Sequence, residues 1–261
     1  TFSPDARYVL YTMDTRPIGF GAMNSRSWGP AGCETVLADA STGEILWSLR
    51  GDDHRGSQYA ISPGFAALTA DAKTIAFTDY NGTMYVVDKS GKIVAQSKSI
   101  DQARERRSGP TDGVGVWIAP DGSCAAYAFR NLVVIWRDGK FIRVQVPEIV
   151  SGFVSPDGST IVLGLDDGEV RALTPDGKTA WSFNTGGVGA LVAPATAGQT
   201  CVATSAGHLI LLTKDGKEIR RIDVAGAADT QKHPITPDDA KERLPRPVDY
   251  RIPPTLEIAK A

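Results

Sequence analysis

A unit of four short strand-like segments recurs along this chain and constrains its fold more than any other feature. The unit is clearest in residues 113–146, where the segments GVGVWIA, CAAYAFR, LVVIWR and KFIRVQV follow one another. The turn Pro120-Asp121-Gly122-Ser123 separates the first two segments, and Asp138-Gly139 separates the last two. Asp-Gly pairs favour tight hairpins because Gly tolerates positive φ without steric cost. The unit therefore predicts a small antiparallel sheet of four strands.

The same unit fits the chain five times. The Gly of its last hairpin falls at Gly43, Gly91, Gly139, Gly177 and Gly216, so the steps are 48, 48, 38 and 39 residues. Helical solenoids have similar periods, but the segments here are short, β-branched and bounded by turn residues, which indicates strands. A period of roughly 40 residues with four strands per unit is typical of propeller blades. We therefore predict an all-β fold, a β-propeller with at least five four-stranded blades.

The two ends of the chain depart from the repeat. Residues 2–5 correspond to the end of an inner strand and its turn, so we expect the first blade to be incomplete at the N terminus. The missing strand would come from the tail, from an upstream segment or from another chain. The five visible units are a minimum, and they are compatible with a complete ring of six to eight blades. Residues 225–261 contain six prolines, which remove donors from a strand ladder. We predict blades over 1–224 and a proline-rich extended tail or strap over 225–261, with disorder as the alternative for the tail.

Composition excludes several classes of partner. The formal net charge is −2, which implies no global attraction to nucleic acid or to an anionic membrane. We also find no apolar run near the roughly 20 residues that span a bilayer. The cysteines and histidines have no metal-ligand spacing, so we interpret Cys124 and Cys201 as buried packing residues. We assign no catalytic, cofactor-binding or metal-binding residue, and we expect no cofactor.

Two motifs resemble those of known repeat families. Residues 2–5 (FSPD) and 154–158 (VSPDG) resemble the turn of WD-like repeats in TolB-type propellers, and residues 39–47 (DASTGEILW) resemble the tryptophan-docking motif of quinoprotein-like (PQQ-like) repeats. This resemblance implies a propeller over residues 1 to about 224, and it favours a periplasmic or extracellular location. A resemblance to quinoprotein dehydrogenases, in particular, implies eight blades held together by docking tryptophans around a quinone. It also implies a bound calcium or lanthanide ion, a catalytic Asp and often two adjacent cysteines. Here Trp47 and Trp181 supply the docking residue in two units of five, and no cysteines are adjacent.

The repeated residues have structural explanations. Trp47 and Trp181 occupy equivalent places on outer strands, so we predict that they pack between neighbouring blades. In the same place units three and five carry Arg143 and Arg220. The recurring Asp residues sit in turns, where a carboxylate bonds to nearby backbone amides, so local hydrogen bonding is the expected role.

The strongest functional signal is where the long connections fall. Strands in a blade alternate in direction, so the connections over 14–32, 51–63 and 99–112 are expected on one face, and long loops on a rigid scaffold commonly carry recognition. Trp and Arg are frequent binding anchors, and these connections contain Arg26, Trp28, Arg104, Arg106 and Arg107. Solvated loops are the simpler alternative for the arginine run. We predict a noncatalytic scaffold or complex subunit that binds a protein partner here; the alternative is an enzyme or small-ligand binder that uses the central channel.

Overall fold

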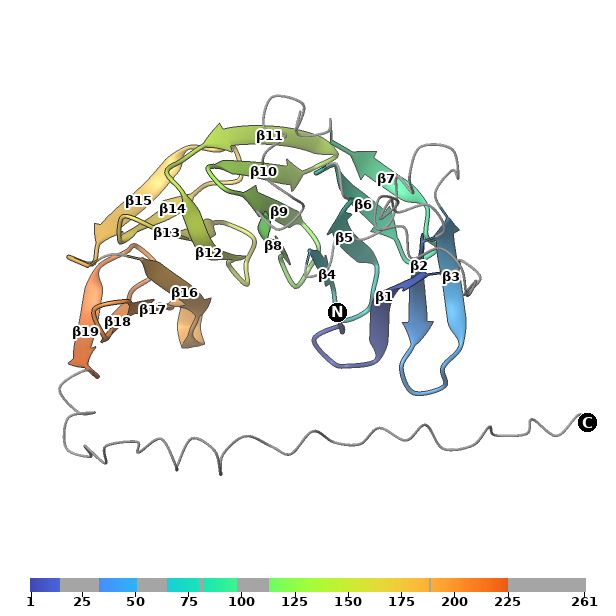
Figure 1. Cartoon of the computed structure of the whole chain (residues 1–261), viewed down its shortest axis with the longest axis horizontal. Helices are drawn as coiled ribbons and strands as arrows, with labels where there is room; N and C mark the ends of the chain where they lie inside the picture. Colours follow the sequence, from blue (N-terminus) through green and yellow to red (C-terminus); the bar gives the residue numbers. More distant parts are fainter. Residues whose placement is uncertain (15–32, 51–64, 80–81, 98–112, 188, 225–261) are drawn as a thin grey trace, which may run out of the picture. The chain divides into compact units, whose positions relative to one another are not determined.

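The computed structural model describes residues 1–14, 33–50, 65–79, 82–97, 113–187 and 189–224. These residues form five antiparallel sheets, one after another along the chain (Figure 1). We call the sheets blades 1 to 5. In the described part of the chain the one helical element is a single 3-10 turn, η3 (Thr196–Gly198). The predicted all-β propeller fold is therefore confirmed.

The strands follow the predicted repeat closely. Blade 1 has three strands, and Phe2 adds an isolated bridge to Val9. The other blades have four strands each, in chain order across the sheet. Blade 1 contains β1 (Tyr8–Asp14), β2 (Cys33–Asp39) and β3 (Ile45–Arg50). Blade 2 contains β4 (Ala66–Leu68), β5 (Thr74–Thr78), β6 (Met84–Asp88) and β7 (Ile93–Gln96). Blade 3 contains β8 (Gly113–Ile118), β9 (Cys124–Phe129), β10 (Leu132–Arg137) and β11 (Lys140–Gln145). Blade 4 contains β12 (Ile149–Val154), β13 (Ile161–Leu165), β14 (Glu169–Leu173) and β15 (Thr179–Asn184). Blade 5 contains β16 (Ala190–Pro194), β17 (Thr200–Thr204), β18 (His208–Leu212) and β19 (Glu218–Asp223).

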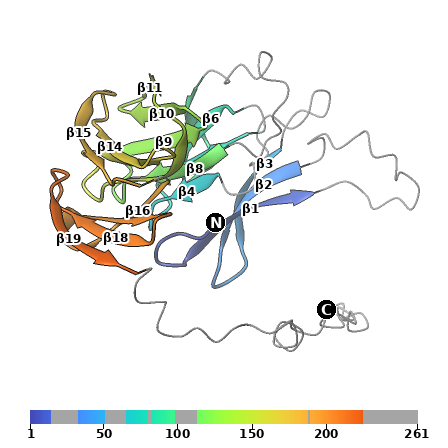
Figure 2. The same cartoon turned by 60° about the vertical axis from the view of Figure 1, so that its left-hand side comes forward.

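Successive blades pack face to face. The inner strands β4, β8, β12 and β16 are neighbours, and both cartoon views show the sheets side by side (Figures 1 and 2). Side chains alternate between the two faces of a strand, so each blade has one face for the blade before it and one for the blade after it. We call these its preceding face and its following face. Buried apolar clusters fill the space between blades 1 and 2, 2 and 3, 3 and 4, and 4 and 5.

The two docking tryptophans lie at these junctions, as predicted. Trp47 is 8% exposed and packs in the cluster between blades 1 and 2. Trp181 is half-buried and packs against the cluster between blades 4 and 5. The hairpin Gly of the next blade lies on each ring: a Cβ built on Gly91 would be 2.9 Å from the Trp47 indole, and one on Gly216 would be 2.4 Å from the Trp181 indole. The hairpin glycines therefore permit close contact between blades as well as tight turns.

The assignment of Arg143 to the docking position is wrong. Blades 1, 2, 4 and 5 have a register shift in the outer hairpin, and this shift turns the fourth residue after Gly onto the following face. Blade 3 pairs β10 with β11 without a shift. Ile142 and Val144 of blade 3 therefore lie on its following face, beside Gly177 of blade 4. Arg143 lies between them on the opposite, preceding face, where it pairs with Val134. One inserted residue decides which face a side chain occupies.

Candidate protein-binding site

Each blade has two edges of different character. At the turn edge lie the inner turns and the outer hairpins, such as residues 119–124 and 174–178. The connections between the second and third strands of a blade, and those from one blade to the next, lie at the opposite edge. We call this the loop edge. In blade 1, Asp14 pairs with Cys33, and Glu34 pairs with Arg50, so three strand ends meet at the loop edge. The connections over residues 15–32 and 51–64 begin here, and the connection over residues 98–112 leaves β7 and enters β8 at the same edge of blades 2 and 3.

The predicted partner-binding residues fall within these connections. Arg26, Trp28, Arg104, Arg106 and Arg107 all lie outside the described residues. What the structure describes is the scaffold that holds the connections, namely the strand ends of blades 1, 2 and 3. The sheets behind these ends are well packed, with Leu37, Phe77 and Val133 at 0% exposure. Such a scaffold fixes the points from which each connection starts and returns.

A cavity of about 490 Å³ lies at the loop edge between blades 3 and 4. It is lined by Val114, Arg130, Asn131, Val146, Pro147, Glu148 and Ile149. Arg130 has φ of 48°, a left-handed conformation that allows the tight turn from β9 to β10. The backbone amide of Ile149 donates to the Arg130 carbonyl (2.7 Å) and thereby links the turn to the next blade. This cavity presents polar and charged groups beside the entry to blade 4, and the sequence reasoning missed it.

The turn edge uses its carboxylates for local structure, as predicted. Asp157 accepts hydrogen bonds from the hydroxyls of Ser155 (2.6 Å) and Ser159 (2.8 Å) and from the Ser159 amide (3.0 Å). These donors lower the pKa of Asp157 to about 2, because each of them favours the charged carboxylate. Asp5, Asp71 and Asp176 accept equivalent bonds from Ser3, Thr69 and Thr174. A group held ionised in this way is a turn stabiliser and a poor general acid.

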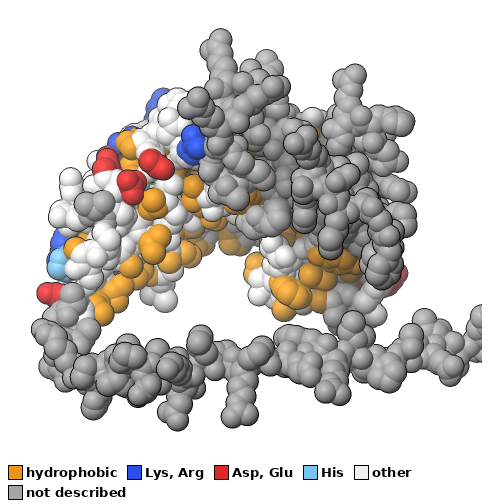
Figure 3. All heavy atoms as spheres, viewed as in Figure 1, with side chains coloured by type: hydrophobic (Ala, Val, Ile, Leu, Met, Phe, Trp, Pro, Cys, Tyr) orange, Lys and Arg blue, Asp and Glu red, His pale blue; other side chains and the backbone are white. Residues whose placement is uncertain are grey.

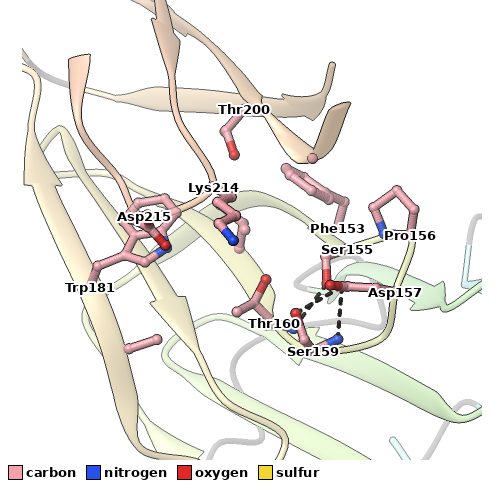
Figure 4. A pocket seen from close by; sticks show the side chains of 13 residues that line it. Phe153, Ser155, Pro156, Asp157, Ser159, Thr160, Trp181, Thr200, Lys214 and Asp215 are labelled. Carbon is pink, nitrogen blue, oxygen red and sulfur yellow. Dashed lines mark hydrogen bonds between the residues drawn. The ribbon is translucent and has the colours of Figure 1, made fainter. Parts of the chain in front are cut away.

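A second cavity of about 580 Å³ opens at the turn edge between blades 4 and 5 (Figure 4). Phe153, Pro156 and Trp181 give it an apolar wall, and Lys214 and Asp215 approach from the blade 5 hairpin (Figure 4). Thr160 and Thr200 add hydroxyls from the two blades. The irregular turn of blade 5, which ends in η3, contributes Gly198 to this cavity. The sequence showed that irregular turn, but the cavity depends on how two blades pack and was not predicted.

Within the described ranges, no cluster of three or more His, Cys, Asp or Glu side chains is arranged to hold a metal ion. Cys124 is buried, and burial raises the pKa of its thiol to about 11, which fits the predicted packing role. Cys201 is only half-buried, so the packing role predicted for it is incomplete. The described residues contain no helical segment that could span a lipid bilayer.

Comparison with known proteins identifies the family. No curated protein matches the chain. A family model described as outer membrane protein assembly factor BamB matches residues 34–182, which is more than half of the 261 residues. The matched segment runs from β2 of blade 1 to β15 of blade 4. The predicted resemblance to PQQ-like repeat propellers is thereby confirmed, and the chain belongs to the family of outer membrane protein assembly factor BamB.

Proposed function

We propose that this protein is a noncatalytic β-propeller that binds a protein partner through its loop edge. The partner would be a component of the machinery that assembles outer membrane proteins, as the description of its family suggests. The observation that carries the proposal is that the strand ends flanking three long connections, 15–32, 51–64 and 98–112, share the loop edge of blades 1 to 3.

The two edges of the propeller support this choice of surface. At the turn edge the connections are short, and their Asp, Ser and Thr side chains bond to one another and to local amides. At the loop edge of blades 1 to 3, three connections span 18, 14 and 15 residues (15–32, 51–64 and 98–112). Long connections on a rigid scaffold tolerate sequence variation without loss of the fold, and they commonly hold binding residues.

The residues in these connections suit a protein interface. Trp28 follows Arg26 in the first connection, and Arg104, Arg106 and Arg107 lie in the third. Trp and Arg are enriched among the few residues that carry most of the binding free energy at interfaces. We propose that Trp28 is an apolar anchor and that the arginine run pairs with carboxylates of the partner. The interaction should therefore weaken as the salt concentration rises.

Copurification with the intact chain tests this proposal. One variant carries Trp28→Ala, and a second carries Arg106→Glu with Arg107→Glu. A matched control reverses two exposed charges at the turn edge, Lys140→Glu with Lys217→Glu. All three variants should show the circular dichroism and thermal unfolding of the parent.

We expect the loop-edge variants to lose the partner and the turn-edge control to retain it. If both loop-edge variants fold and keep every partner of the parent, the loop edge is not the interface. If the turn-edge control loses the partner instead, the binding surface lies on the opposite edge.

A further inference from the structure

The inner turns of successive blades pack on one another at three of the four described junctions. A Cβ built on Gly122 of blade 3 would meet Thr74 of blade 2, and one built on Gly158 of blade 4 would meet Ser123 of blade 3. Ala72 holds the same place in blade 2 and is fully buried in the cluster between blades 1 and 2. Each of these turns therefore closes the turn edge of the junction that precedes it.

The inner turn of blade 5 departs from this arrangement. Its closing backbone hydrogen bond joins Ala195 to Gln199, four residues apart, whereas the equivalent bonds of blades 1 to 4 span five residues. Among the described residues, a Cβ built on Gly198 in this shorter turn meets only Lys214, which belongs to blade 5 itself. The turn therefore leaves open the part of blade 4 that an inner turn covers at the other junctions. The cavity of about 580 Å³ lies at this place.

The junction between blades 1 and 2 shows what occupies the same place there. At the end of the blade 1 inner turn, the amide of Tyr8 donates to the Ser3 hydroxyl (2.9 Å). At the end of the blade 4 inner turn, the amide of Thr160 donates in the same way to the Ser155 hydroxyl (2.9 Å). Tyr8 and Thr160 are therefore equivalent residues. The phenol ring of Tyr8 is 2% exposed and packs in the cluster between the two blades, whereas Thr160 has no ring to fill this space.

A lysine of the following blade contacts the phenol of Tyr8. The ammonium of Lys89 donates to the Tyr8 hydroxyl (2.6 Å) and lies 4.5 Å from the centroid of the ring. Lys89 stands two residues before the hairpin Gly91, and Lys214 stands two residues before the hairpin Gly216. Each of these glycines lies on a docking tryptophan, so the two lysines hold equivalent places. The junction between blades 4 and 5 therefore keeps the lysine of this pair and lacks its ring.

The walls of the cavity suit an aromatic ring that carries a hydroxyl. Phe153, Pro156 and Trp181 supply an apolar wall, and the Lys214 ammonium points into the cavity (Figure 4). Within the described ranges, Lys214 has no ion-pair partner. Thr200 is 2% exposed, and its hydroxyl, which has no hydrogen-bond partner among the described side chains and backbone, also points into the cavity (Figure 4). Because a buried hydroxyl without a partner is costly, a ligand that bonds to it is favoured.

The cavity is separate from the other surfaces of blade 5 and from the loop edge. Every residue that lines it lies in blade 4 or blade 5. Hydrophobic side chains gather at the surface over β16 (Figure 3), but no residue of β16 lines the cavity. Its volume falls within the roughly 300–1,000 Å³ of small-ligand sites. A ligand in this cavity would therefore bind independently of the partner proposed for the loop edge.

We propose that the cavity between blades 4 and 5 binds a phenol ring from another molecule, in the place that Tyr8 takes between blades 1 and 2. The ring packs against the apolar wall. The Lys214 ammonium donates to its hydroxyl and lies near its face, where the π electrons attract a cation. The Thr200 hydroxyl adds a second polar contact. Two sources carry such a ring, namely a tyrosine side chain in a peptide and a small free phenol.

The first test supplies the ring from the chain itself. Thr160→Tyr should raise the thermal unfolding midpoint, because the new ring fills the cavity and meets Lys214 as Tyr8 meets Lys89. Adding Lys214→Met should remove part of this gain. Adding Lys217→Met instead should leave the gain unchanged, because Lys217 is exposed on the same hairpin and does not line the cavity. A midpoint that falls in Thr160→Tyr would mean that a phenol does not fit between these blades.

The second test measures binding to the intact chain. N-acetyl-tyrosinamide is titrated to millimolar concentration, and amide chemical shifts are followed by NMR. We expect saturable shifts at Gly198, Thr200 and Lys214. Binding should weaken about tenfold in Lys214→Met, stay unchanged in Lys217→Met and disappear in Thr160→Tyr. The proposal is overturned if the parent shows no saturable shifts at these residues, or if Thr160→Tyr binds as well as the parent.

Two further ligands identify the source of the ring and the role of its hydroxyl. N-acetyl-phenylalaninamide lacks the hydroxyl and should bind more weakly than N-acetyl-tyrosinamide, because Lys214 then has no oxygen to contact. Equal binding of these two amides would contradict the contact with Lys214. Tighter binding of N-acetyl-tyrosinamide than of p-cresol would assign the site to a peptide, and equal binding of the two would assign it to a free phenol.

Discussion

The following faces of blades 4 and 5 have matching positions and similar side chains, but among the described residues only the blade 4 face is covered by another blade. Val170 of blade 4 is fully buried beneath blade 5, while Leu209 of blade 5 is 39% exposed. Both are aliphatic residues on the third strand of a four-stranded sheet. The difference between them therefore arises from what packs against each sheet, and the strands themselves are built alike. The strand pattern of a repeat therefore does not by itself distinguish a covered blade face from an exposed one.

The largest expected difference in stability is between variants that place a charge on each of the two faces. Val170→Asp should lower the free energy of unfolding by about 3–5 kcal/mol, because it leaves an unpaired carboxylate at the buried junction. Leu209→Asp should cost about 1 kcal/mol or less in the single chain, mainly from the low strand propensity of Asp. Urea unfolding in dilute solution measures both values. Equal losses would mean that the blade 5 face is also buried.

A smaller effect is expected at the two hairpin glycines Gly216 and Gly43, which have nearly the same φ of 75° and 74°. An Ala at either position costs about 1 kcal/mol for a left-handed backbone. At Gly216 the added Cβ would also lie 2.4 Å from the Trp181 ring, whereas at Gly43 it meets nothing within 4 Å in the described part of the chain. Gly216→Ala should therefore lower the thermal unfolding midpoint more than Gly43→Ala. The reverse order would contradict close packing of the blade 5 hairpin on Trp181.

The smallest expected effect is on stability at low pH. The inner turn of blade 4 has a carboxylate, Asp157, whereas the inner turn of blade 5 has none. The pKa of Asp157 falls from 3.8 to about 2 in the folded protein, chiefly through the Ser155 and Ser159 hydroxyls. A depressed pKa contributes stability above the unfolded value, and this contribution disappears as the pH drops from about 4 through about 2. Asp157→Asn should reduce the loss of stability over this window, and Ser159→Ala should reduce it less. Urea midpoints at several pH values measure it; an unchanged pH profile in Asp157→Asn would contradict this role.

The sequence predicted the fold because its turn chemistry repeats. Each hairpin Gly and each Asp of an inner turn follows from local backbone requirements, so spacing alone locates the strands. Local pattern also placed Trp47 and Trp181 between blades correctly. It failed at Arg143, because the register shift that other blades have in the outer hairpin is absent from blade 3. Such a shift leaves no clear signal in the residues themselves.

The candidate site was less predictable for a different reason. The sequence located the long connections, and the strand ends that flank them share one edge, but Trp28 and the arginines lie outside the described residues. The cavity near Lys214 and Asp215 forms only where two blades meet, so no single repeat predicts it. Cys201 was expected to be buried because, like Cys124, it lies at the beginning of the second strand of its unit. Its half-buried state reflects how little the other described residues cover its side chain, which strand composition cannot reveal.

The most direct test of the contrast between the two faces uses a thiol at one matched position. Cys201 of blade 5 corresponds to Val162 of blade 4 by strand register. In a Cys33→Ser chain, maleimide labelling compares Cys201 with the thiol introduced by Val162→Cys. We expect Cys201 to react readily, while the thiol at position 162 stays protected, because Val162 is buried at the junction with blade 5 and Cys201 is half-buried. If Cys201 is as protected as position 162, the blade 5 face is covered and the contrast between the two faces is wrong.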